Sequence, residues 1–365
     1  MFGQHEFSTL VVTAVLGKGV AFCIQAVGDR IPIQFGNFHG SKVPEGVPCF
    51  NLKLAENANC FGSIVYTKQI AGMTVVRIPL PKEFSFGLTI EFLKRSPREL
   101  LHRPLEDRVI KLLRIGEELV LFSVREGGNA IVLEVLHGDN SPIVRKEITR
   151  YVTEWFDLAS DLKKFYAMAR KDDLLKGLVK KYSGYRIVGQ PDLYESLVWA
   201  VLGQQINLQF AYTLKQRFVE KFGECLEHGG QCYYLFPTPA VVAGLEPAQL
   251  LALQFSRQKA SYTIGIAQAF VDGTISKQAL AGKSLQEAKE ELMKIKGIGN
   301  WTANYGLMKT FRYPDAFPLE DAGLHNALKN LLKLKSKPDV GKVRRIFKKY
   351  KGWEAYATLY LWRSL

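Results

Sequence analysis

The stretch Leu292-Met-Lys-Ile-Lys-Gly-Ile-Gly-Asn-Trp-Thr-Ala-Asn-Tyr305 carries the strongest indication of the fold, and Phe317-Pro-Leu-Glu-Asp-Ala-Gly-Leu324 follows it closely. Upstream, Ser284 and Glu287 have the spacing of a capping box, in which each residue bonds the backbone of the other. The residues after them are rich in helix formers. The pattern therefore predicts a helix that begins near Ser284 and ends at about Ile295.

Two glycines follow the end of this helix and predict a tight turn. Gly297 and Gly299 allow backbone angles that are closed to other residues, and Asn300 is expected to cap a second helix that runs through Tyr305. Such a turn presents bare N–H groups beside a helix N-terminus, which suits a phosphate. A lone Gly-x-Gly is equally typical of an ordinary interhelical turn without a ligand.

A single carboxylate follows the second helix. Pro314 should end that helix, Pro318 keeps the next residues extended, and a further helix is expected from Glu320 or Asp321 to Leu332. At a helix start Asp321 has two interpretations. It is either a plain N-cap or an ionised group that can stabilise positive charge on a sugar during bond cleavage.

The segment Lys296–Tyr305, followed at this spacing by Phe317–Leu324, resembles the helix-hairpin-helix (HhH-GPD) DNA glycosylases, and specifically the bacterial DNA-3-methyladenine glycosylase II type. The resemblance covers roughly the last two hundred residues well, and it continues more weakly through residues 84–161, where this family carries a small mixed sheet domain. Further matching segments are Leu202–Asn207, Ser256–Ala260 and Trp353–Trp362.

The resemblance implies roles for individual residues. Asp321 matches the aspartate that supports an oxocarbenium-like sugar and activates the attacking water. Trp301, Tyr305 and Trp362 match the aromatic lining of the base pocket, where stacking is worth about 1–3 kcal/mol per base. For Tyr305 and Trp362, packing in the hydrophobic core is an equally open interpretation.

A second loop is expected between two apolar helical stretches, Leu193–Leu202 and Phe210–Phe222. Gln204, Gln205 and Ile206 fall there and should form a turn. The resemblance implies that this turn intercalates in the duplex, where a side chain offsets part of the cost of base flipping. We assign that wedge to Gln205, and an ordinary polar surface turn remains the alternative.

The resemblance also bears on cofactors and mechanism. It implies that Lys296, Gly297, Ile298 and Gly299 contact the DNA backbone, and that carbonyls near Ile295 and Ile298 hold a monovalent cation. No other cofactor is expected. Strand-nicking relatives carry a Schiff-base lysine where this chain has Trp301, so we expect a monofunctional enzyme that uses water. No cysteine follows Cys232, which argues against an iron–sulfur cluster.

Two positions depart from the family pattern. Gln254 stands where relatives often have Gly, and Glu354 replaces an arginine that is common in the Trp-x-x-Tyr-Ala stretch. We expect both departures to affect local geometry more than the reaction.

Composition favours a polyanionic partner. The chain has 49 Lys plus Arg against 35 Asp plus Glu, a formal charge of +14 and a pI near 9.4. Anionic lipid would satisfy this charge too, but basic residues concentrate beside the proposed DNA hairpin. Any one of them can also belong to a solvated helix face. They are Lys329, Lys333, Lys335, Lys337, Lys342, Arg344, Arg345, Lys348, Lys349 and Lys351.

The sequence predicts a cytoplasmic protein, associated with the nucleoid, that does not enter a membrane. No stretch approaches the roughly 18 uninterrupted apolar residues of a membrane helix. The apolar segment Phe7–Val27 resembles two strands more than a signal peptide. Five widely spaced cysteines without Cys-x-x-Cys pairs predict neither a zinc site nor disulfides.

Hydrophobic periodicity divides the chain and predicts an α+β fold. Strand-like runs such as Leu10–Val15, Thr74–Ile78, Glu118–Val124 and Ala130–Val135 precede residue 150, and helical spacing follows it. We expect a β-rich segment of unknown role that includes the Gly40–Pro48 loop, a mixed α/β sheet domain and an all-α helix-hairpin-helix catalytic region. Their predicted ranges are residues 1–75, 76–150 and 151–365.

Together these features predict a monofunctional DNA glycosylase that acts as a monomer on double-stranded DNA in base excision repair. The resemblance, together with the aromatic pocket, implies that its substrates are alkylated purines, 3-methyladenine and 7-methylguanine, since aromatic pockets attract electron-poor cationic bases. Two alternatives remain open, which are a non-catalytic protein that binds damaged DNA and a glycosylase for oxidised, deaminated or mismatched bases.

Overall fold

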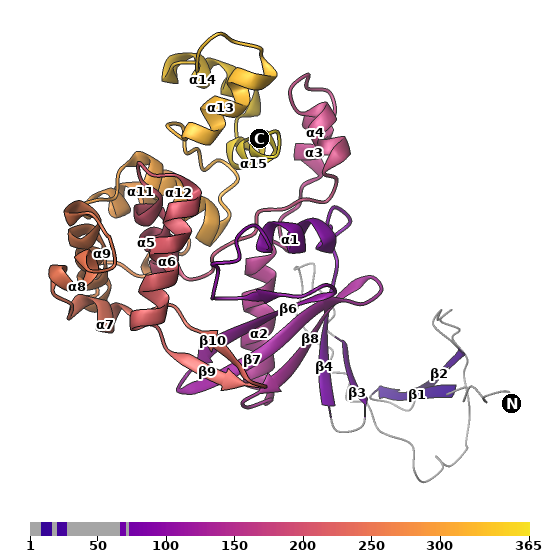
Figure 1. The fold of residues 1–365 in the computed structure, drawn as a ribbon. Coiled ribbons are helices and arrows are strands. Elements are labelled where there is room, and N and C mark those ends of the chain that lie inside the picture. The colour runs from indigo at the N-terminus through magenta and orange to yellow at the C-terminus, as the bar shows by residue number, and fades with distance from the viewer. Residues whose placement is uncertain (1–8, 17–19, 28–65, 71–72) are drawn as a thin grey trace, which may run out of the picture. The chain divides into compact units, whose positions relative to one another are not determined.

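The chain forms two units, Met1–Gly62 and Ser63–Leu365, in the computed structural model. In the first unit, strands β1 (Thr9–Leu16) and β2 (Val20–Val27) pair as an antiparallel hairpin. The second unit holds the large sheet and every helix of the described residues (Figure 1). The structure describes residues 9–16, 20–27, 66–70 and 73–365, with side chains from residue 75 onward.

The hairpin β1–β2 confirms the two strands predicted between Phe7 and Val27. The predicted Gly40–Pro48 loop lies outside the described residues. The role of residues 1–75 stays without an assignment.

A six-stranded antiparallel sheet forms the β-part of the second unit, in the order β3-β4-β8-β7-β6-β5. It confirms the three strands predicted between residues 74 and 135 and the α+β class. The strands are β3 (Tyr66–Ile70), β4 (Met73–Pro79), β5 (Arg103–Pro104), β6 (Arg108–Ile115), β7 (Glu118–Glu126) and β8 (Ala130–His137).

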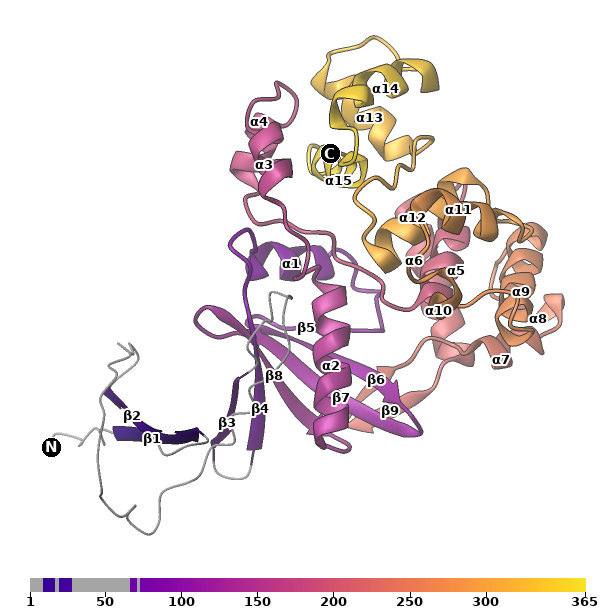
Figure 2. The same ribbon diagram turned by 180° about the vertical axis from the view of Figure 1, so that it is seen from behind.

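Both faces of the central strands are covered, which explains why β7 is buried without alternation along most of its length. On one face pack α1 (Phe86–Leu93) and α2 (Pro142–Trp155), and Figure 2 shows α2 lying along the sheet. On the other face, Leu121 and neighbouring apolar residues pack against Tyr233.

Helix α2 is built by its sequence to cover a sheet. Its N-cap Ser141 is followed by Pro142 in the first turn, and Val144, Ile148 and Val152 recur at helical spacing to form the buried stripe. The helix continues through residue 150, so no break in regular structure marks the predicted domain boundary there. That division of the chain stays a prediction.

The remainder is mostly helical. Among the described residues no helix is long and apolar enough to cross a membrane. The helices are α3 (Lys163–Ala169), α4 (Lys176–Lys181), α5 (Leu193–Gly203), α6 (Leu208–Phe222), α7 (Pro239–Ala243), α8 (Pro247–Leu251), α9 (Arg257–Val271), α10 (Lys277–Leu280), α11 (Leu285–Met293), α12 (Asn300–Phe311), α13 (Ala322–Leu331), α14 (Val340–Phe347), the short 3₁₀ turn Lys348–Tyr350 and α15 (Glu354–Trp362).

A short hairpin that the sequence prediction did not anticipate interrupts these helices. Strands β9 (Cys225–His228) and β10 (Gln231–Tyr234) are joined by Gly229 and Gly230, whose φ angles are 59° and 70°. A two-residue hairpin turn with both central φ angles positive is the form that two glycines allow. The hairpin supplies Tyr233, which covers the outer face of the large sheet.

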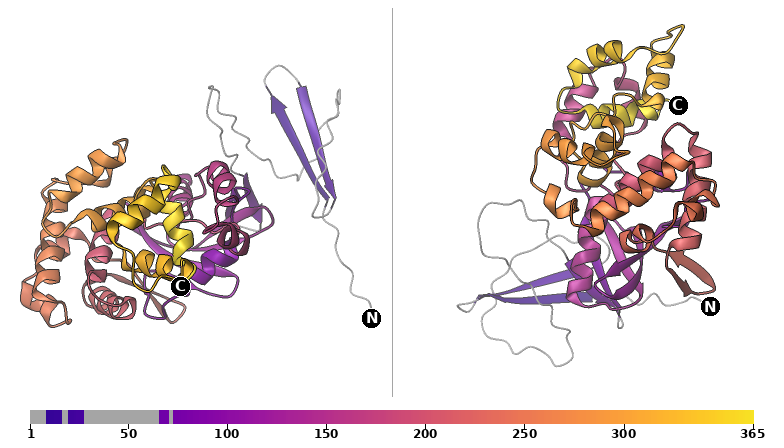
Figure 3. Two further views of the ribbon diagram at one scale, coloured as in Figure 1. Left: turned by 90° about the horizontal axis from the view of Figure 1, so that it is seen from above. Right: turned by 90° about the vertical axis from the view of Figure 1, so that its left-hand side faces the viewer.

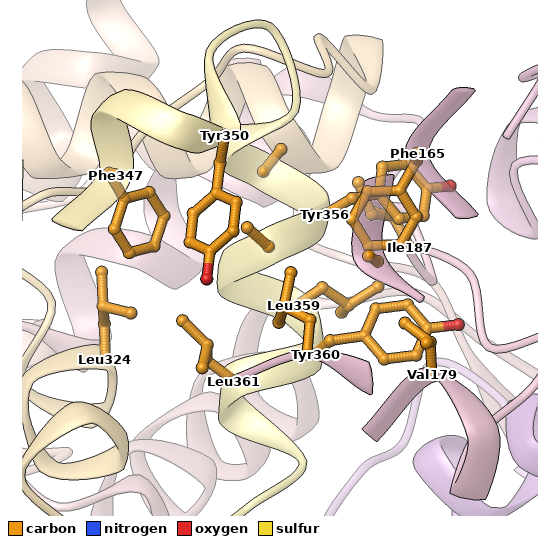
Figure 4. Packing of buried hydrophobic residues seen from close by; sticks show 14 of the residues in the cluster. Phe165, Val179, Ile187, Leu324, Phe347, Tyr350, Tyr356, Leu359, Tyr360 and Leu361 are labelled. Carbon is orange, nitrogen blue, oxygen red and sulfur yellow. The ribbon is translucent and has the colours of Figure 1, made fainter. Parts of the chain in front are cut away.

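Two hydrophobic cores organise the helices. One lies around α5, α9 and α12, and the other gathers α3, α4, α13 and α14 around the buried α15. Figure 3 shows α3 and α4 beside these last helices although they are far apart in the sequence. In Figure 4, the tyrosines of α15 project into this second core, where Phe165 lies 5.4 Å from both Tyr356 and Tyr360 between ring centroids.

A buried ion pair joins the sheet side to the helices. Lys215 of α6 places its Nζ 2.9 Å from Glu99 Oε2 and 3.4 Å from Glu195 Oε1. Burial is the largest single influence and would raise the pKa of Glu99, but the charges of Lys215 and His102 and the hydrogen bonds from Leu101 and Lys215 together outweigh burial and lower that pKa to about 2. The carboxylate therefore stabilises the folded state in its ionised form.

Replacing Glu99 with Gln should lower the free energy of unfolding by about 3 kcal/mol, because Lys215 would lose its nearer carboxylate inside the protein. The folded-state pKa of Glu99 is lowered from 4.5 to about 2, so its contribution is complete above pH 4.5 and is lost as the pH falls through about 2. Denaturant titrations across this range should show the difference between the two proteins narrowing. Asp107→Asn, in an exposed ion pair, is the matched control and should change little. A difference that stays constant down to about pH 3 would contradict this account.

Candidate active site

The predicted helix, turn and second helix are present as α11, the Lys294–Gly299 turn and α12. The capping box is confirmed, since Ser284 Oγ accepts from the Glu287 amide and Glu287 Oε2 accepts from the Ser284 amide at 2.8 Å. Helix α11 ends at Met293, two residues before the predicted end at Ile295.

The two glycines of the turn have different reasons to be glycine. Gly297 has a φ of 97°, and a Cβ there would lie 2.3 Å from Cγ of the Tyr262 ring. Both its conformation and its surroundings therefore require glycine. Gly299 has an extended backbone and open space around its Cα, so a side chain would meet no obstacle there.

The prediction that Asn300 caps α12 is wrong. Gly299 is the N-cap residue, no side chain caps the helix, and Asn300 is its first residue. The Asn300 amide instead donates to both carboxylate oxygens of Glu320, at 2.9 and 3.0 Å. Asn304, one turn later, accepts from the Phe317 amide at 2.9 Å. The two asparagines thus tie the helix to the segment that carries Asp321.

Asp321 is the N-cap of α13, as expected for an acid at a helix start, and its Oδ1 accepts from the Leu324 amide at 2.7 Å. Two tryptophans from distant segments also donate to this carboxylate. Trp362 Nε1 lies 2.7 Å from Oδ1, and Trp301 Nε1 lies 3.2 Å from Oδ2. The residue is half-buried. Three N–H donors therefore fix the carboxylate while one side of it stays accessible.

Gly323 lets these groups approach one another. A Cβ at this position would lie 3.0 Å from Asp321 Oδ1 and 3.4 Å from the indole of Trp362. The Asp-Ala-Gly sequence therefore combines the carboxylate with the space its tryptophan partner needs. The sequence alone gave no indication that Gly323 makes room for the Trp362 indole beside Asp321.

The three predicted pocket aromatics, Trp301, Tyr305 and Trp362, are all half-buried. Trp301 stacks on Tyr305 with ring centroids 5.4 Å apart and an interplanar angle of 24°. Tyr305 also packs against a small buried cluster that contains Trp199, and Trp362 packs against the core around α15. Tyr305 and Trp362 therefore each contact a hydrophobic core, whereas Trp301 contacts the Tyr305 ring and the Asp321 carboxylate.

The predicted turn between α5 and α6 is confirmed, but its three residues behave differently. Gln204 faces the hairpin and donates to the Gly297 carbonyl at 3.1 Å and to Thr302 Oγ1 at 2.9 Å. Ile206 is half-buried against apolar neighbours. Gln205 alone is exposed, in the left-handed conformation with φ 57°.

The α5–α6 turn and the turn between α11 and α12, called the hairpin below, line a common groove of about 580 Å³. Residues Gln204–Ile206 form one wall, and the segment from Met293 to Gly299 forms another. Asp321 and the three pocket aromatics do not line it. The groove therefore lies between the α5–α6 turn and the Lys294–Gly299 turn, and the Asp321 carboxylate does not form part of its lining.

Sequence reasoning missed several residues that support the site. Trp199 Nε1 donates to the Tyr305 hydroxyl at 3.1 Å, and its ring lies 4.8 Å from that of Tyr212. Arg95 donates to the Tyr212 hydroxyl, and its Cζ lies 4.0 Å from the Phe92 ring centroid. The Trp199–Tyr305 and Arg95–Tyr212 hydrogen bonds each join residues more than a hundred positions apart, so no local pattern could reveal them.

His325 is a further supporting residue. Its Nε2 lies 2.9 Å from the Leu319 carbonyl, and its Nδ1 lies 2.9 Å from the Pro338 carbonyl. The ring therefore links the segment just before Asp321 to the loop before α14. The position of His325 one turn after the N-cap was the only signal in the sequence.

The two departures from the family pattern have local explanations. Gln254 has a φ of 71°, a conformation that glycine adopts more freely than other residues. Glu354 forms no ion pair within the described part of the chain, and burial raises its pKa. Neither residue contacts Asp321.

Residues 73–365 and the described N-terminal strands contain no group of three or more His, Cys, Asp and Glu side chains arranged to hold a metal ion. Cys225 and Cys232, both exposed, are free thiols. The hairpin carbonyls predicted to hold a monovalent cation are part of the turn, where the Ile298 amide donates to the Ile295 carbonyl at 3.1 Å.

The site thus consists of a helix-hairpin-helix turn beside a carboxylate that accepts from two tryptophans. The comparison with known families agrees with this description. Residues 198–352 match the family described as "HhH-GPD superfamily base excision DNA repair protein", and residues 83–197 match "8-oxoguanine DNA glycosylase, N-terminal domain". The chain belongs to the HhH-GPD superfamily of base excision DNA repair proteins and is a DNA N-glycosylase.

Among its relatives, a protein named DNA-3-methyladenine glycosylase from Bacillus subtilis is 40% identical over 294 residues, which cover 80% of this chain and 97% of the relative. DNA-3-methyladenine glycosylase 2 of Escherichia coli is 30% identical over 49% of this chain and 60% of its own length. The fold is similar to that of a 3-methyladenine DNA glycosylase from Archaeoglobus fulgidus, with a TM-score of 0.69 and 22% identity over 79% of this chain and 97% of that one.

Gly297→Ala should destabilise the protein by about 1–3 kcal/mol, because the new Cβ would need a positive φ and would overlap the Tyr262 ring. Gly299→Ala is the matched control, since it has neither a positive φ nor a neighbour within 4 Å. Denaturant unfolding of both variants measures the difference. Equal stability of the two would show that the turn tolerates a side chain at Gly297.

Proposed function

We propose that this chain is a monofunctional glycosylase that hydrolyses the N-glycosidic bond of alkylated purines in double-stranded DNA. The observation that carries the proposal is the carboxylate of Asp321, held by two indole N–H groups directly beside the helix that the hairpin opens. The substrates in view are 3-methyladenine and 7-methylguanine. The named activity of the Bacillus subtilis relative supports this substrate class.

Asp321 is the proposed catalytic residue. As the bond to the purine breaks, the base leaves with the bonding electrons and positive charge develops on the sugar. The negative carboxylate stabilises that charge, and water then adds to the sugar carbon and gives its proton to the Asp321 carboxylate, which leaves an abasic site. An alkylated purine is already cationic and leaves as a neutral base. One carboxylate can therefore suffice without a strong general acid.

Trp301, Tyr305 and Trp362 are proposed to receive the flipped base. Aromatic faces stack on any base and attract a cationic one more strongly. In this chain the Trp301 and Trp362 rings also orient Asp321 through their N–H groups. The same residues would thus recognise the base and align the carboxylate with its sugar.

The hairpin Lys296–Gly299 is proposed to bind the DNA backbone beside the N-terminus of α12, because no side chain caps the first amides of that helix. Carbonyls near Ile295 and Ile298 would hold a monovalent cation that bridges to phosphate. Gln205 would enter the duplex as the base leaves it, which agrees with its exposure on the turn. The enzyme would act as a monomer in the cytoplasm, on nucleoid DNA.

Asp321→Asn should reduce release of methylpurine by about 10²–10³-fold, because the negative charge that stabilises the sugar is lost. Binding to duplex DNA should persist, since the hairpin is unchanged. Single-turnover release of free base from methylated DNA measures the effect, with Glu320→Gln as the control for the neighbouring acid. Release at the wild-type rate by Asp321→Asn would refute its role. Tight binding without release by the wild type would instead favour a damage-binding protein.

Borohydride added during the reaction should trap no covalent complex with DNA, because Trp301 occupies the position of the Schiff-base lysine and water is the nucleophile. A duplex panel that contains 7-methylguanine, hypoxanthine, 8-oxoguanine and uracil should show fastest release of the alkylated base. Preferred release of 8-oxoguanine would favour the alternative suggested by the match of residues 83–197. A trapped complex would exclude the water-based mechanism.

A further inference from the structure

Lys259 is a buried cation in the first turn of α9, with 8% of its surface exposed. Its Nζ lies 2.8 Å from the Val201 carbonyl, 2.9 Å from the Leu202 carbonyl and 2.6 Å from the Gln204 carbonyl. An ammonium group has three N–H donors and no acceptor, so three carbonyls satisfy it completely. Lys259 is therefore committed to backbone and has no donor left for a phosphate.

The three carbonyls lie where α5 ends, and that of Val201 also accepts from the Gln204 backbone amide at 3.2 Å. The last turn of a helix has no intrahelical donors for its carbonyls and carries partial negative charge, so a lysine ammonium is a strong partner for it. Helix α5 ends at Gly203, and the turn that carries Gln205 begins at once. The contact consequently sets the direction in which the chain leaves α5.

Gln204 extends this contact to the hairpin. Its backbone carbonyl accepts from Lys259, while its side-chain amide donates to the Gly297 carbonyl and to Thr302 Oγ1. One residue thus links the N-terminus of α9, the end of α5 and the start of α12. Gln205, the next residue, adopts φ 57°, a conformation that costs a non-glycine residue energy unless its neighbours hold it.

The charges around Lys259 favour this backbone role. Lys294 and Lys296 face the same groove from the hairpin segment, and Tyr262 lines it from α9. No acidic side chain lines the groove. Among the residues that the structure describes, Lys259 forms no ion pair, and its ammonium bonds the carbonyls of Val201, Leu202 and Gln204.

We propose that Lys259 is a positioning residue that couples the DNA-backbone hairpin to the turn carrying Gln205, so that binding the phosphate and entering the base stack occur as one step. The inference rests on the proposed function, because it assigns Gln205 to the base stack. Lys259 does not touch the substrate in this account. It holds the Gln204–Gln205 backbone, and Gln204 transmits that position to Gly297.

The test compares targets that are hard and easy to flip. Base extrusion costs a few kcal/mol for a paired target and less for an unpaired one, so a defect in insertion should appear mainly with the paired target. Duplexes carry 7-methylguanine opposite either cytosine or an abasic analogue, and single-turnover release is measured for both. In further duplexes 2-aminopurine takes the place of the target base, and its fluorescence emission reports base extrusion without bond cleavage.

Lys259→Met should slow release from the paired duplex by about tenfold and from the unpaired duplex by no more than about twofold, and it should reduce the 2-aminopurine signal. Lys259→Arg should restore most of the loss, because guanidinium also donates several charged hydrogen bonds to carbonyls. Gln204→Leu, which leaves Lys259 in place, should reproduce the selective defect even if Lys259→Met folds poorly. Lys146→Met, on the exposed face of α2, is the matched control.

An equal loss for paired and unpaired targets in Gln204→Leu and Lys259→Met would mean that these residues only support the fold, and would overturn the coupling. Wild-type extrusion by Gln204→Leu would overturn it as well. If the wild-type protein releases no base but the 2-aminopurine signal still depends on Lys259 and Gln204, the proposed glycosylase activity fails while the coupling stands.

Discussion

The indole N–H groups of Trp301 and Trp362 both donate to the carboxylate of Asp321, and the arrangement of the helices makes these two hydrogen bonds possible. Trp301 lies in the first turn of α12, Trp362 ends α15, and Asp321 begins α13. The ends of three helices must therefore converge within hydrogen-bond distance. Their positions come from two separate cores, because α12 packs mainly into the one around α5 and α9, whereas α13 and α15 pack into the other.

Side chains that bind backbone hold the irregular segments between these helices. Asn304 accepts from the Phe317 amide, His325 contacts the Leu319 carbonyl, and Lys259 donates to carbonyls at the end of α5. Loops carry functional groups well when a rigid scaffold positions them. Here a few polar side chains of the helices bond the backbone of the loops and fix their positions. The site therefore combines accessible residues with a defined geometry.

Short-range patterns predicted the local parts of the site well. The capping box at Ser284, the glycine turn and the helix start at Asp321 all depend on residues within about four positions of each other. The prediction failed where distant groups compete for a side chain. Asn300 has the chemistry of an N-cap, but Glu320 is available in the folded protein and binds its amide instead. The hairpin β9–β10 was missed because each of its strands is short.

The sequence by itself determined the α+β class, the helix-hairpin-helix element, the acid at a helix start and, through resemblance, the family. These features are encoded in backbone preferences and local hydrogen bonds, which a short window of residues specifies. Only the tertiary structure decided that Trp301 and Trp362 donate to Asp321 and that Gln204 joins its turn to the hairpin. Such partners are 20 to 98 residues apart, and the packing of the two cores brings them into contact.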